Sequence, residues 1–171
     1  LDLVFCHPGQ MLAIGGLAIE RSRFQKLLHC DPAEAEGNLL WGRDFDALAQ
    51  QAGNGFYNLT YQKGYSIFAG DRSPVKKLGW ADYYTSVGIT GVHMPLTGEA
   101  AVNPNIPDVG LPFAMCHEMA HRMCIAQEQD ANFAAFMACD ANESVNFRYA
   151  GYFMAYRYCY NALAQVDPAA A

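Results

Sequence analysis

The stretch CHEMAHRMC, residues 116–124, decides what fold this chain is expected to adopt. It places His117 and His121 four residues apart, with Glu118 directly after the first histidine. Positions i and i+4 of a helix are offset by about 40° around the axis and about 6 Å along it, so both imidazoles would project from one face. A helix here would let both rings bind one metal ion, while the carboxylate of Glu118 reaches a water molecule beside it.

The residues around this motif predict a helix that is largely buried. Nothing between residues 111 and 122 breaks a helix, and Pro112 stands where a first-turn proline is favourable. A buried helix that keeps histidine, glutamate and histidine at these spacings needs a reason to do so, because burying polar groups costs free energy. We therefore interpret the motif as a metal site rather than as the polar face of a surface helix. The apolar neighbours are Met115, Cys116, Met119, Ala120 and Met123.

A catalytic zinc site needs a third protein ligand and leaves its fourth position open. The candidates downstream are Cys124, Glu128, Asp130 and Glu143. Cys124 shares the histidine face, but a straight helix would carry it about 4.5 Å further along the axis than His121. Glu128 and Asp130 reach the histidines only if the first helix ends near Cys124 and a second helix packs back against it.

The segment EQDAN, residues 128–132, is the best source of the third ligand. Glu128 and Asn132 are four residues apart and share one helix face, so one can ligate the metal while the other orients an imidazole from behind. We favour Glu128 as the ligand, with Asn132 as its supporting residue and Asp130 as the rival ligand. The alternative reading is an acidic helix start that interacts with the positive end of the helix dipole.

The remainder of the chain predicts an α+β fold, with helices, a small strand region and then helices again. We expect one domain over residues 1–171, helical in its N-terminal part, 1–70. Tyr, Thr, Val, Ile and Gly dominate residues 56–98 and indicate short strands. In the first part we expect a helix over 8–30, an interruption at 31–38, and a helix from Asp44 to a glycine stop at 53–55. Strands follow over 56–98, with a helix around 74–86, and then a loop over 95–112. The last part is expected to form helices from 113 to 124, from 128 to 139 and, after a turn at 142–144, to about 163.

Composition excludes several function classes. The 171 residues are 52% hydrophobic and 16% charged, with a formal net charge of −6, and no run of Lys and Arg occurs. Binding to nucleic acid through a basic patch is therefore not expected. No segment reaches the ~18–20 consecutive apolar residues of a membrane span. None of the six cysteines forms a CxxC pair, so a cysteine-rich structural zinc site has no support.

Several motifs over residues 72–160 resemble an uncharacterised bacterial family of HExxH zinc metallopeptidases, catalogued as a domain of unknown function. The first 70 residues resemble it only weakly. The family has Gly at the position of Cys124 and Glu at the position of Asp130, so the shorter Asp130 is the poorer ligand. The matching motifs are GITG (88–91), the PLTGEAAVN segment (95–103), LPF (111–113), HEMAH (117–121), EQDANF (128–133) and FRYAGY (147–152).

This resemblance implies a zincin-like fold, mostly helical, with a small sheet beside the active-site helix. The ExxxN spacing is similar to the ExxxD motif of gluzincin membrane proteases, which implies Glu128 as the ligand and Asn132 in the position of the aspartate. GITGVHMP (88–95) is then expected to be the edge strand that pairs with an extended substrate. Family members usually carry transmembrane helices ahead of the soluble domain. This implies a bacterial protein anchored through a segment absent from this chain, with the domain outside the bilayer.

Together these features predict a peptidase with one Zn²⁺ per chain that acts on a peptide or protein substrate. Glu118 would serve as general base for a zinc-activated water. A second electrophile should stabilise the oxyanion, and Tyr149 and Tyr152 are candidates, with Arg148 and His93 as further residues of suitable type. Each of these residues also fits a simple packing role. The alternative function is a catalytically inactive metal-binding sensor or interaction domain of a membrane-associated protein.

Overall fold

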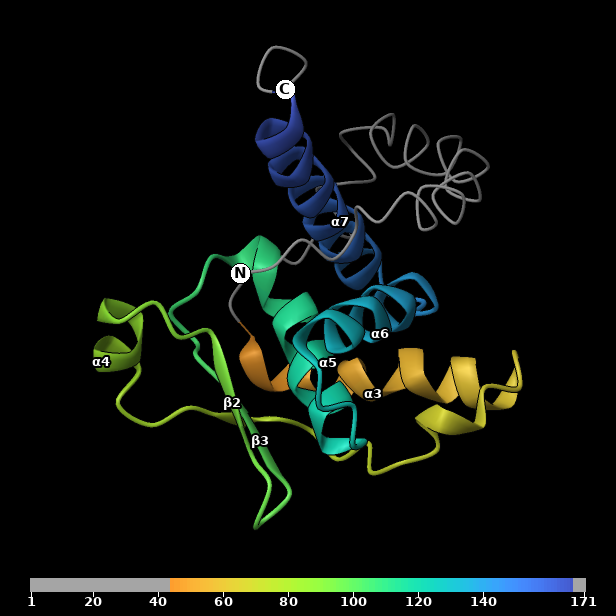
Figure 1. The fold of residues 1–171 in the computed structure, drawn as a ribbon. Coiled ribbons are helices and arrows are strands. Elements are labelled where there is room, and N and C mark those ends of the chain that lie inside the picture. Colours follow the sequence, from red (N-terminus) through yellow and green to blue (C-terminus); the bar gives the residue numbers. More distant parts are fainter. Residues whose placement is uncertain (1–43, 168–171) are drawn as a thin grey trace, which may run out of the picture.

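A computed structural model describes residues 44–167 of the chain (Figure 1). It combines helices with one small sheet, in agreement with the predicted α+β class. The helix expected over 8–30 and its interruption at 31–38 lie outside the described residues. The described elements are α3 (Phe45–Tyr61), η1 (Ser66–Phe68), β1 (Lys76–Lys77), α4 (Ala81–Ser86), β2 (Gly91–Met94), β3 (Glu99–Val102), η2 (Asp108–Gly110), α5 (Leu111–Arg122), α6 (Glu128–Asp140) and α7 (Val145–Val166).

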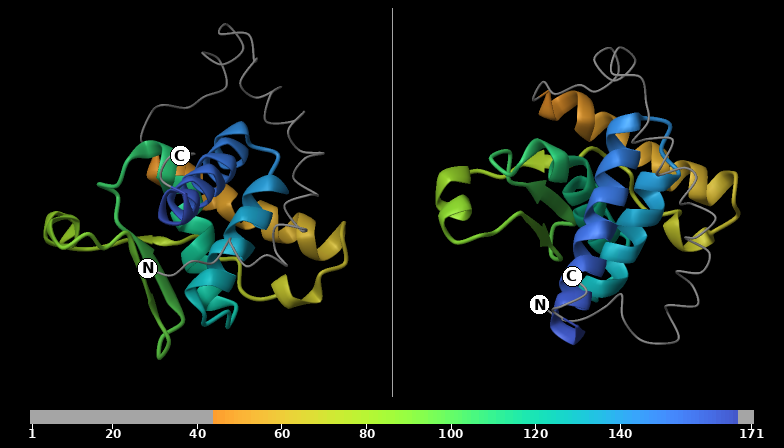
Figure 2. Two further views of the ribbon diagram at one scale, coloured as in Figure 1. Left: turned by 45° about the horizontal axis from the view of Figure 1, so that its top comes forward. Right: turned by 90° about the horizontal axis from the view of Figure 1, so that it is seen from above.

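Helix α5 is the central element, and it contacts both the sheet and the other long helices. Strands β2 and β3 lie along one side of it, while α3, α6 and α7 pack on its other sides (Figures 1 and 2). Its side chains Met115, Cys116 and Met119 are fully buried. The helix that carries the HExxH motif is therefore enclosed by the core, as the apolar flanks of the motif predicted.

The sheet has the strand order β1-β3-β2, so β2 lies at one edge of the described sheet. β2 and β3 form an antiparallel hairpin in which Val92 pairs with Ala101 and Met94 with Glu99. β1 pairs parallel with the other side of β3. The prediction of a loop over 95–112 was wrong for β3, in which Ala100 and Val102 are buried. The Pro, Gly and Asn residues around this short strand favour a loop and mask its signal in the sequence.

Helix α3 corrects the predicted glycine stop at residues 53–55. The helix continues through both glycines to Tyr61, so the prediction of strand structure for FYNLTY (56–61) was also wrong. A Cβ atom on Gly55 would lie 1.9 Å from the carbonyl oxygen of Ala138 in α6. The glycines are therefore sites of close helix contact, and burial of Phe56 and Leu59 on one face outweighs their weak helix propensity.

The region between α3 and β2 also differs from the prediction. The helix expected around 74–86 is confined to the short α4, and Lys76 and Lys77 are a strand instead. Lys76 forms an ion pair with Glu99 on the neighbouring strand. The three helices predicted after residue 111 are confirmed, including Pro112 in the first turn of α5.

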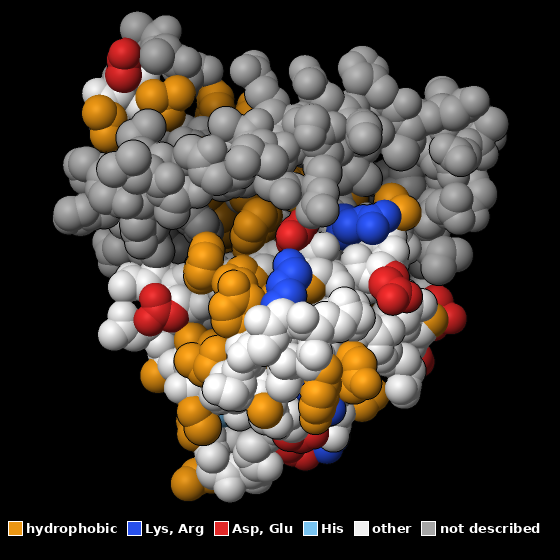
Figure 3. Space-filling view, turned by 90° about the vertical axis from the view of Figure 1, so that its right-hand side faces the viewer, with side chains coloured by type: hydrophobic (Ala, Val, Ile, Leu, Met, Phe, Trp, Pro, Cys, Tyr) orange, Lys and Arg blue, Asp and Glu red, His pale blue; other side chains and the backbone are white. Residues whose placement is uncertain are grey.

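The surface mixes apolar and polar groups. On the face drawn in Figure 3, apolar side chains are interspersed with acidic, basic and other polar groups. Among residues 44–167, no helix has the combination of length and apolar character that crossing a membrane requires.

Candidate metal centre

The two histidines of α5 face each other across one helical turn. Their Nε2 atoms are 3.0 Å apart, and their ring centroids are separated by 4.6 Å in an edge-on arrangement. This follows from their spacing, because i and i+4 side chains of a helix share one face. The structure therefore brings together the two nitrogen atoms that the sequence assigned to a metal.

Helix α5 ends with a turn that sends the chain back toward these histidines. The amide of Ile125 donates to the carbonyl of Ala120 at 3.2 Å, and the amide of Cys124 donates to that of His121 at 3.0 Å. These two bonds form a Schellman motif, whose residue beyond the cap adopts a left-handed conformation. Cys124 occupies that position with φ = +67°. The expected helix end near Cys124 is thus confirmed, and α6 begins shortly afterwards at Glu128.

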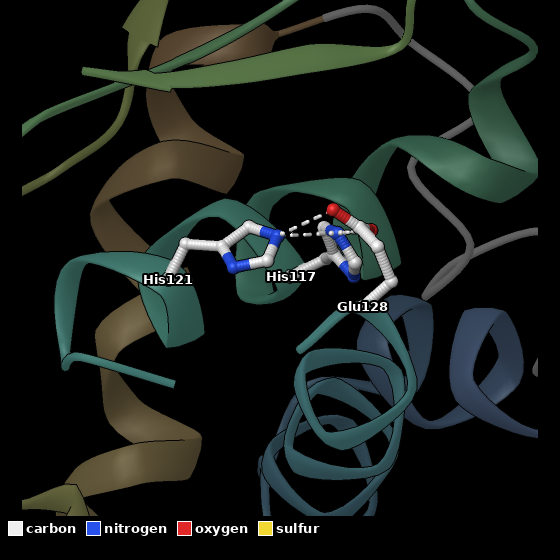
Figure 4. A group of neighbouring side chains, drawn as sticks. All are labelled: His117, His121 and Glu128. Carbon is white, nitrogen blue, oxygen red and sulfur yellow. Dashed lines mark hydrogen bonds and ion pairs between the residues drawn. The ribbon is translucent and has the colours of Figure 1, made fainter. Parts of the chain in front are cut away.

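Glu128, at the first turn of α6, completes the cluster (Figure 4). One carboxylate oxygen lies 3.1 Å from Nε2 of His117, and the other lies 3.3 Å from Nε2 of His121. One ligand atom from each of the three residues lies within 4.8 Å of the others. The carboxylate is largely exposed, whereas both histidine side chains are mostly buried, so the cluster opens to solvent on the side of Glu128.

These separations fit a tetrahedral metal site. Two ligand atoms at 2.0–2.1 Å from a zinc ion in tetrahedral geometry are about 3.3 Å apart. The 3.0 Å between the two Nε2 atoms is close to that value, and each Nε2 lies 3.1 or 3.3 Å from a different carboxylate oxygen of Glu128. Two histidines and one glutamate are also a donor set typical of catalytic zinc.

The hydrogen bond of His121 selects the nitrogen that faces the cluster. Nδ1 of His121 lies 2.8 Å from the carbonyl oxygen of Ile125, which can only accept a hydrogen bond, so Nδ1 carries a proton. In the neutral ring Nε2 then has a free lone pair that points at His117 and Glu128. The same turn that ends α5 thus also orients one of the two candidate ligands.

His117 is held in its neutral form. Burial and the neighbouring His121 lower its pKa, and Glu128 and the side chain of Asn132 offset this only in part. A neutral imidazole is the form that ligates a metal. The supporting role of Asn132 stays a prediction: its side chain lies beside His117, and Nδ1 of His117 has no hydrogen-bond partner of normal geometry.

Glu118 lies on α5 beside the cluster, turned toward the sheet. Burial, together with the negative charge of Glu128, raises its pKa to about 7. A Cβ atom on Gly91 of β2 would lie 2.4 Å from a carboxylate oxygen of Glu118. The edge strand thus approaches the carboxylate so closely that only glycine fits, and Glu118 is confined between α5 and β2.

His93 is a further group that the edge strand contributes. Its ring stacks on that of His121 with centroids 6.3 Å apart and planes inclined by 21°. Burial, together with the neighbouring His121 and Arg122, lowers its pKa. From the sequence, His93 was only one of several residues of suitable type. Its contact with His121 could not be predicted, because the two residues are far apart along the chain.

Other predicted site residues lie elsewhere. Asp130 is exposed and is not part of the cluster. The hydroxyl of Tyr152 donates to Asp140 at 2.9 Å, at the opposite end of α6 from Glu128, which places it roughly 18 Å away along the helix. Tyr149, one turn before Tyr152 on α7, stacks on Phe153. Cys124 is exposed and Glu143 lies beyond α6, and neither joins the cluster.

Tyr158 is the tyrosine of α7 that does reach the site. Its hydroxyl donates to Oδ1 of Asn132 at 3.1 Å, and Asn132 in turn interacts with His117. Nothing in the sequence separates it from the other tyrosines of the aromatic segment 147–160. The antiparallel packing of α6 and α7 is what brings Tyr158, rather than another tyrosine of this segment, next to Asn132.

A family model described as protein of unknown function (DUF3810) matches residues 18–171. No curated protein shows a significant match to the chain, and no solved structure does so either. The matched region covers nearly all of the sequence and includes every residue of the metal cluster. The chain therefore belongs to the family described as protein of unknown function (DUF3810).

Proposed function

We propose that this protein is a zinc-dependent metallopeptidase with a zincin-like catalytic domain. The observation that carries the proposal is the arrangement around α5: two imidazole nitrogens and one carboxylate meet within 3.0–3.3 Å, directly beside a buried carboxyl group. His117, His121 and Glu128 would hold one Zn²⁺. The bound ion would supply a Lewis acid and lower the pKa of a water molecule toward ~7.

Glu118 is suited to serve as the general base. Its raised pKa, about 7, lies close to neutral pH, where a carboxyl group can both accept and return a proton. In the proposed reaction Glu118 accepts the proton of the attacking water as the oxygen adds to the carbonyl carbon of the peptide bond. It then delivers that proton to the leaving amine nitrogen. Gly91 keeps the carboxylate in place on the side of the sheet.

Strand β2 is suited to bind an extended peptide. The amide of Asn103 donates to the carbonyl of Thr90, so by antiparallel alternation Val92 and Met94 bond toward β3. The N–H and C=O groups of Gly91 and His93 then point away from the described sheet. A substrate strand that pairs with them would run beside Glu118, in the β-augmentation mode of peptide recognition.

His93 is the group best placed to interact with the developing oxyanion. It stacks on His121 and projects from the strand proposed to bind substrate. A neutral imidazole can donate one N–H hydrogen bond to a developing negative charge. This assigns to His93 the role that the sequence offered to Tyr149 and Tyr152.

The resemblance to membrane-anchored metallopeptidases supports a further part of the proposal. The full-length protein would be held at a bacterial membrane by another segment, with residues 44–167 outside the bilayer.

The test combines metal content with cleavage of an unfolded protein or a peptide library. We expect about one zinc per chain in the wild type, and its loss in His117→Ala. Glu118→Gln should keep the metal but lower the cleavage rate by at least about 10²-fold, because it removes the general base. Glu143→Gln is the matched control, since Glu143 is exposed and outside the cluster.

One result would count against a peptidase, and a second would count against Glu118 as its general base. If wild type and Glu118→Gln both retain zinc and neither cleaves any substrate, the chain is better described as a metal-binding sensor or interaction domain. If Glu118→Gln cleaves as fast as wild type, another group is the base.

A further inference from the structure

A line of polar contacts runs behind the metal cluster and joins three helices. The hydroxyl of Tyr158 on α7 donates to Oδ1 of Asn132 on α6, at 3.1 Å. The side chain of Asn132 in turn lies beside the ring of His117 of α5. The ring of Tyr158 also packs against Phe113, one helical turn before His117, with centroids 6.3 Å apart. Tyr158 is therefore held beneath His117 by both a ring contact and a hydrogen bond.

Nδ1 is the nitrogen of His117 that is available for a hydrogen bond with Asn132. Nε2 faces His121 and Glu128, which leaves Nδ1 as the nitrogen available on the other side of the ring. Nδ1 is buried and has no hydrogen-bond partner of normal geometry, although the amide of Asn132 lies beside it. A buried imidazole nitrogen in this situation needs a partner, because an unsatisfied one costs about 1–3 kcal/mol.

The orientation of the Asn132 amide decides what it offers to His117. An amide oxygen only accepts hydrogen bonds and has two lone pairs. The hydroxyl proton of Tyr158 on Oδ1 favours the rotamer in which this oxygen, and not the NH₂ group, faces the gap between α5 and α7. The second lone pair of Oδ1 can then accept the Nδ1–H of His117, which leaves the lone pair of Nε2 free.

We infer that Tyr158 is a positioning residue for the metal centre: through Asn132 it holds His117 with Nδ1 protonated and with Nε2 turned toward His121 and Glu128. This inference rests on the proposed zinc site. His121 obtains the same orientation from a backbone carbonyl, that of Ile125. The two histidines thus reach the same ligand form by different routes, one through the helix end and one through α7.

The chain offers a matched control for this role. Tyr152 also lies on α7, and its hydroxyl also donates to a side chain of α6, Asp140, but at the end far from the cluster. Tyr152→Phe and Tyr158→Phe each remove one hydroxyl from the same helix pair. A purely structural role would therefore give the two variants the same metal affinity.

The experiment measures Zn²⁺ affinity by competition with a chromogenic chelator, and the absorption spectrum of the Co²⁺-substituted protein. Outer ligand partners are typically worth 10–100-fold in metal affinity. We expect Tyr158→Phe to weaken zinc binding about tenfold and Asn132→Leu by more than that. Tyr152→Phe should leave affinity at the wild-type value. Asn132→Asp should preserve affinity, because a carboxylate still accepts from both neighbours, and Tyr158→Phe should alter the Co²⁺ spectrum.

Equal zinc affinity in wild type, Tyr158→Phe and Tyr152→Phe would overturn the role of Tyr158 while leaving the zinc site intact. Equal weakening in both tyrosine variants would also overturn it, because the effect would then be a general loss of packing between α6 and α7. Failure of the wild type to bind zinc stoichiometrically would instead overturn the proposed function, and this inference with it.

Discussion

The carboxyl group of Glu118 is buried, which costs the fold stability, at the position where the proposed reaction requires a general base. It is 5% exposed, although carboxylates are rarely buried without a cationic partner. Burial and the charge of Glu128 raise its pKa from an ordinary 4.5 to about 7. In the folded protein without metal, the protonated form is therefore favoured relative to the unfolded chain.

This shift predicts a pH-dependent stability difference between the metal-free wild type and Glu118→Gln. The contribution of Glu118 is fully present below about pH 4.5 and is lost as the pH rises through 7, amounting to about 3 kcal/mol. At pH 8, in the presence of a chelator, Glu118→Gln should have the larger free energy of unfolding by urea. Near pH 4.5 the difference should vanish. A difference that is the same at both pH values would contradict the shift.

Cys124 is strained by its backbone rather than used for its thiol. It adopts φ = +67°, a conformation that costs a residue with a Cβ atom about 1–2 kcal/mol relative to glycine. The hydrogen bond that its amide N–H donates to the carbonyl of His121 nevertheless belongs to the turn that returns the chain to the cluster. The identity of this residue therefore affects stability more than it affects metal ligation.

We predict that Cys124→Gly raises the free energy of unfolding by about 1 kcal/mol, measured by urea denaturation. Cys124→Ala should stay near the wild-type value, because alanine keeps the Cβ atom. Zinc affinity should be the same in all three proteins. A loss of affinity in both variants would identify the thiol as a ligand.

At the scale of elements, the separation of α3 and α6 depends on glycine. Gly55 lies opposite the backbone of Ala138, and no side chain fits between them. Two buried asparagines also form hydrogen bonds between α3 and the end of α6. Asn58 donates to the carbonyl of Ala141 at 2.9 Å, and Asn142 donates to the carbonyl of Gln51 at 3.0 Å. Helix α6, which carries Glu128, is positioned by these contacts.

Gly55→Ala should therefore destabilise the protein by roughly 3 kcal/mol, even though alanine is the better helix former, because overpacking forces the two helices apart. The control is Asn54→Ala at the exposed position between the two glycines, which should stabilise by about 0.5 kcal/mol. Thermal unfolding followed by circular dichroism measures both. Equal effects of the two substitutions would show that the helix contact tolerates a methyl group.

At the scale of the whole molecule, the candidate centre joins elements that are far apart in the sequence. Its candidate ligands come from α5 and α6, Tyr158 comes from α7, and Gly91 and His93 come from β2. An ion that binds this arrangement but not the unfolded chain must stabilise the entire fold. Metal binding and global stability are therefore expected to be linked.

This linkage predicts that zinc raises the melting temperature. At a free zinc concentration 100 times the dissociation constant, the gain is about 2.7 kcal/mol, or roughly 5–10 °C for a chain of this size. A chelator should reverse the shift, and His117→Ala should show none. Scanning calorimetry with and without zinc measures it. An equal shift in His117→Ala would place the ion elsewhere.

Much of the fold was predictable wherever short-range interactions dominate. Helix α5, its end near Cys124, the start of α6 at Glu128 and the turn before α7 follow from side-chain spacing and from Pro112. The secondary structure of the segments 53–61 and 99–102 was not predictable. Glycines and polar neighbours there suggest a stop or a loop, while contacts with Ala138 and with two flanking strands override that local tendency.

The sequence by itself determined the residue types of the candidate centre, namely a HExxH helix followed by an acidic residue at a helix start, because these depend on positions a few residues apart. Only the tertiary structure decided that Glu128 and not Asp130 faces the histidines, that Gly91 makes room for Glu118, and that Tyr158 and not Tyr152 donates a hydrogen bond to Asn132. The physical reason is that these choices depend on how α5, α6, α7 and β2 pack, and packing joins residues whose separation along the chain carries no periodic signal.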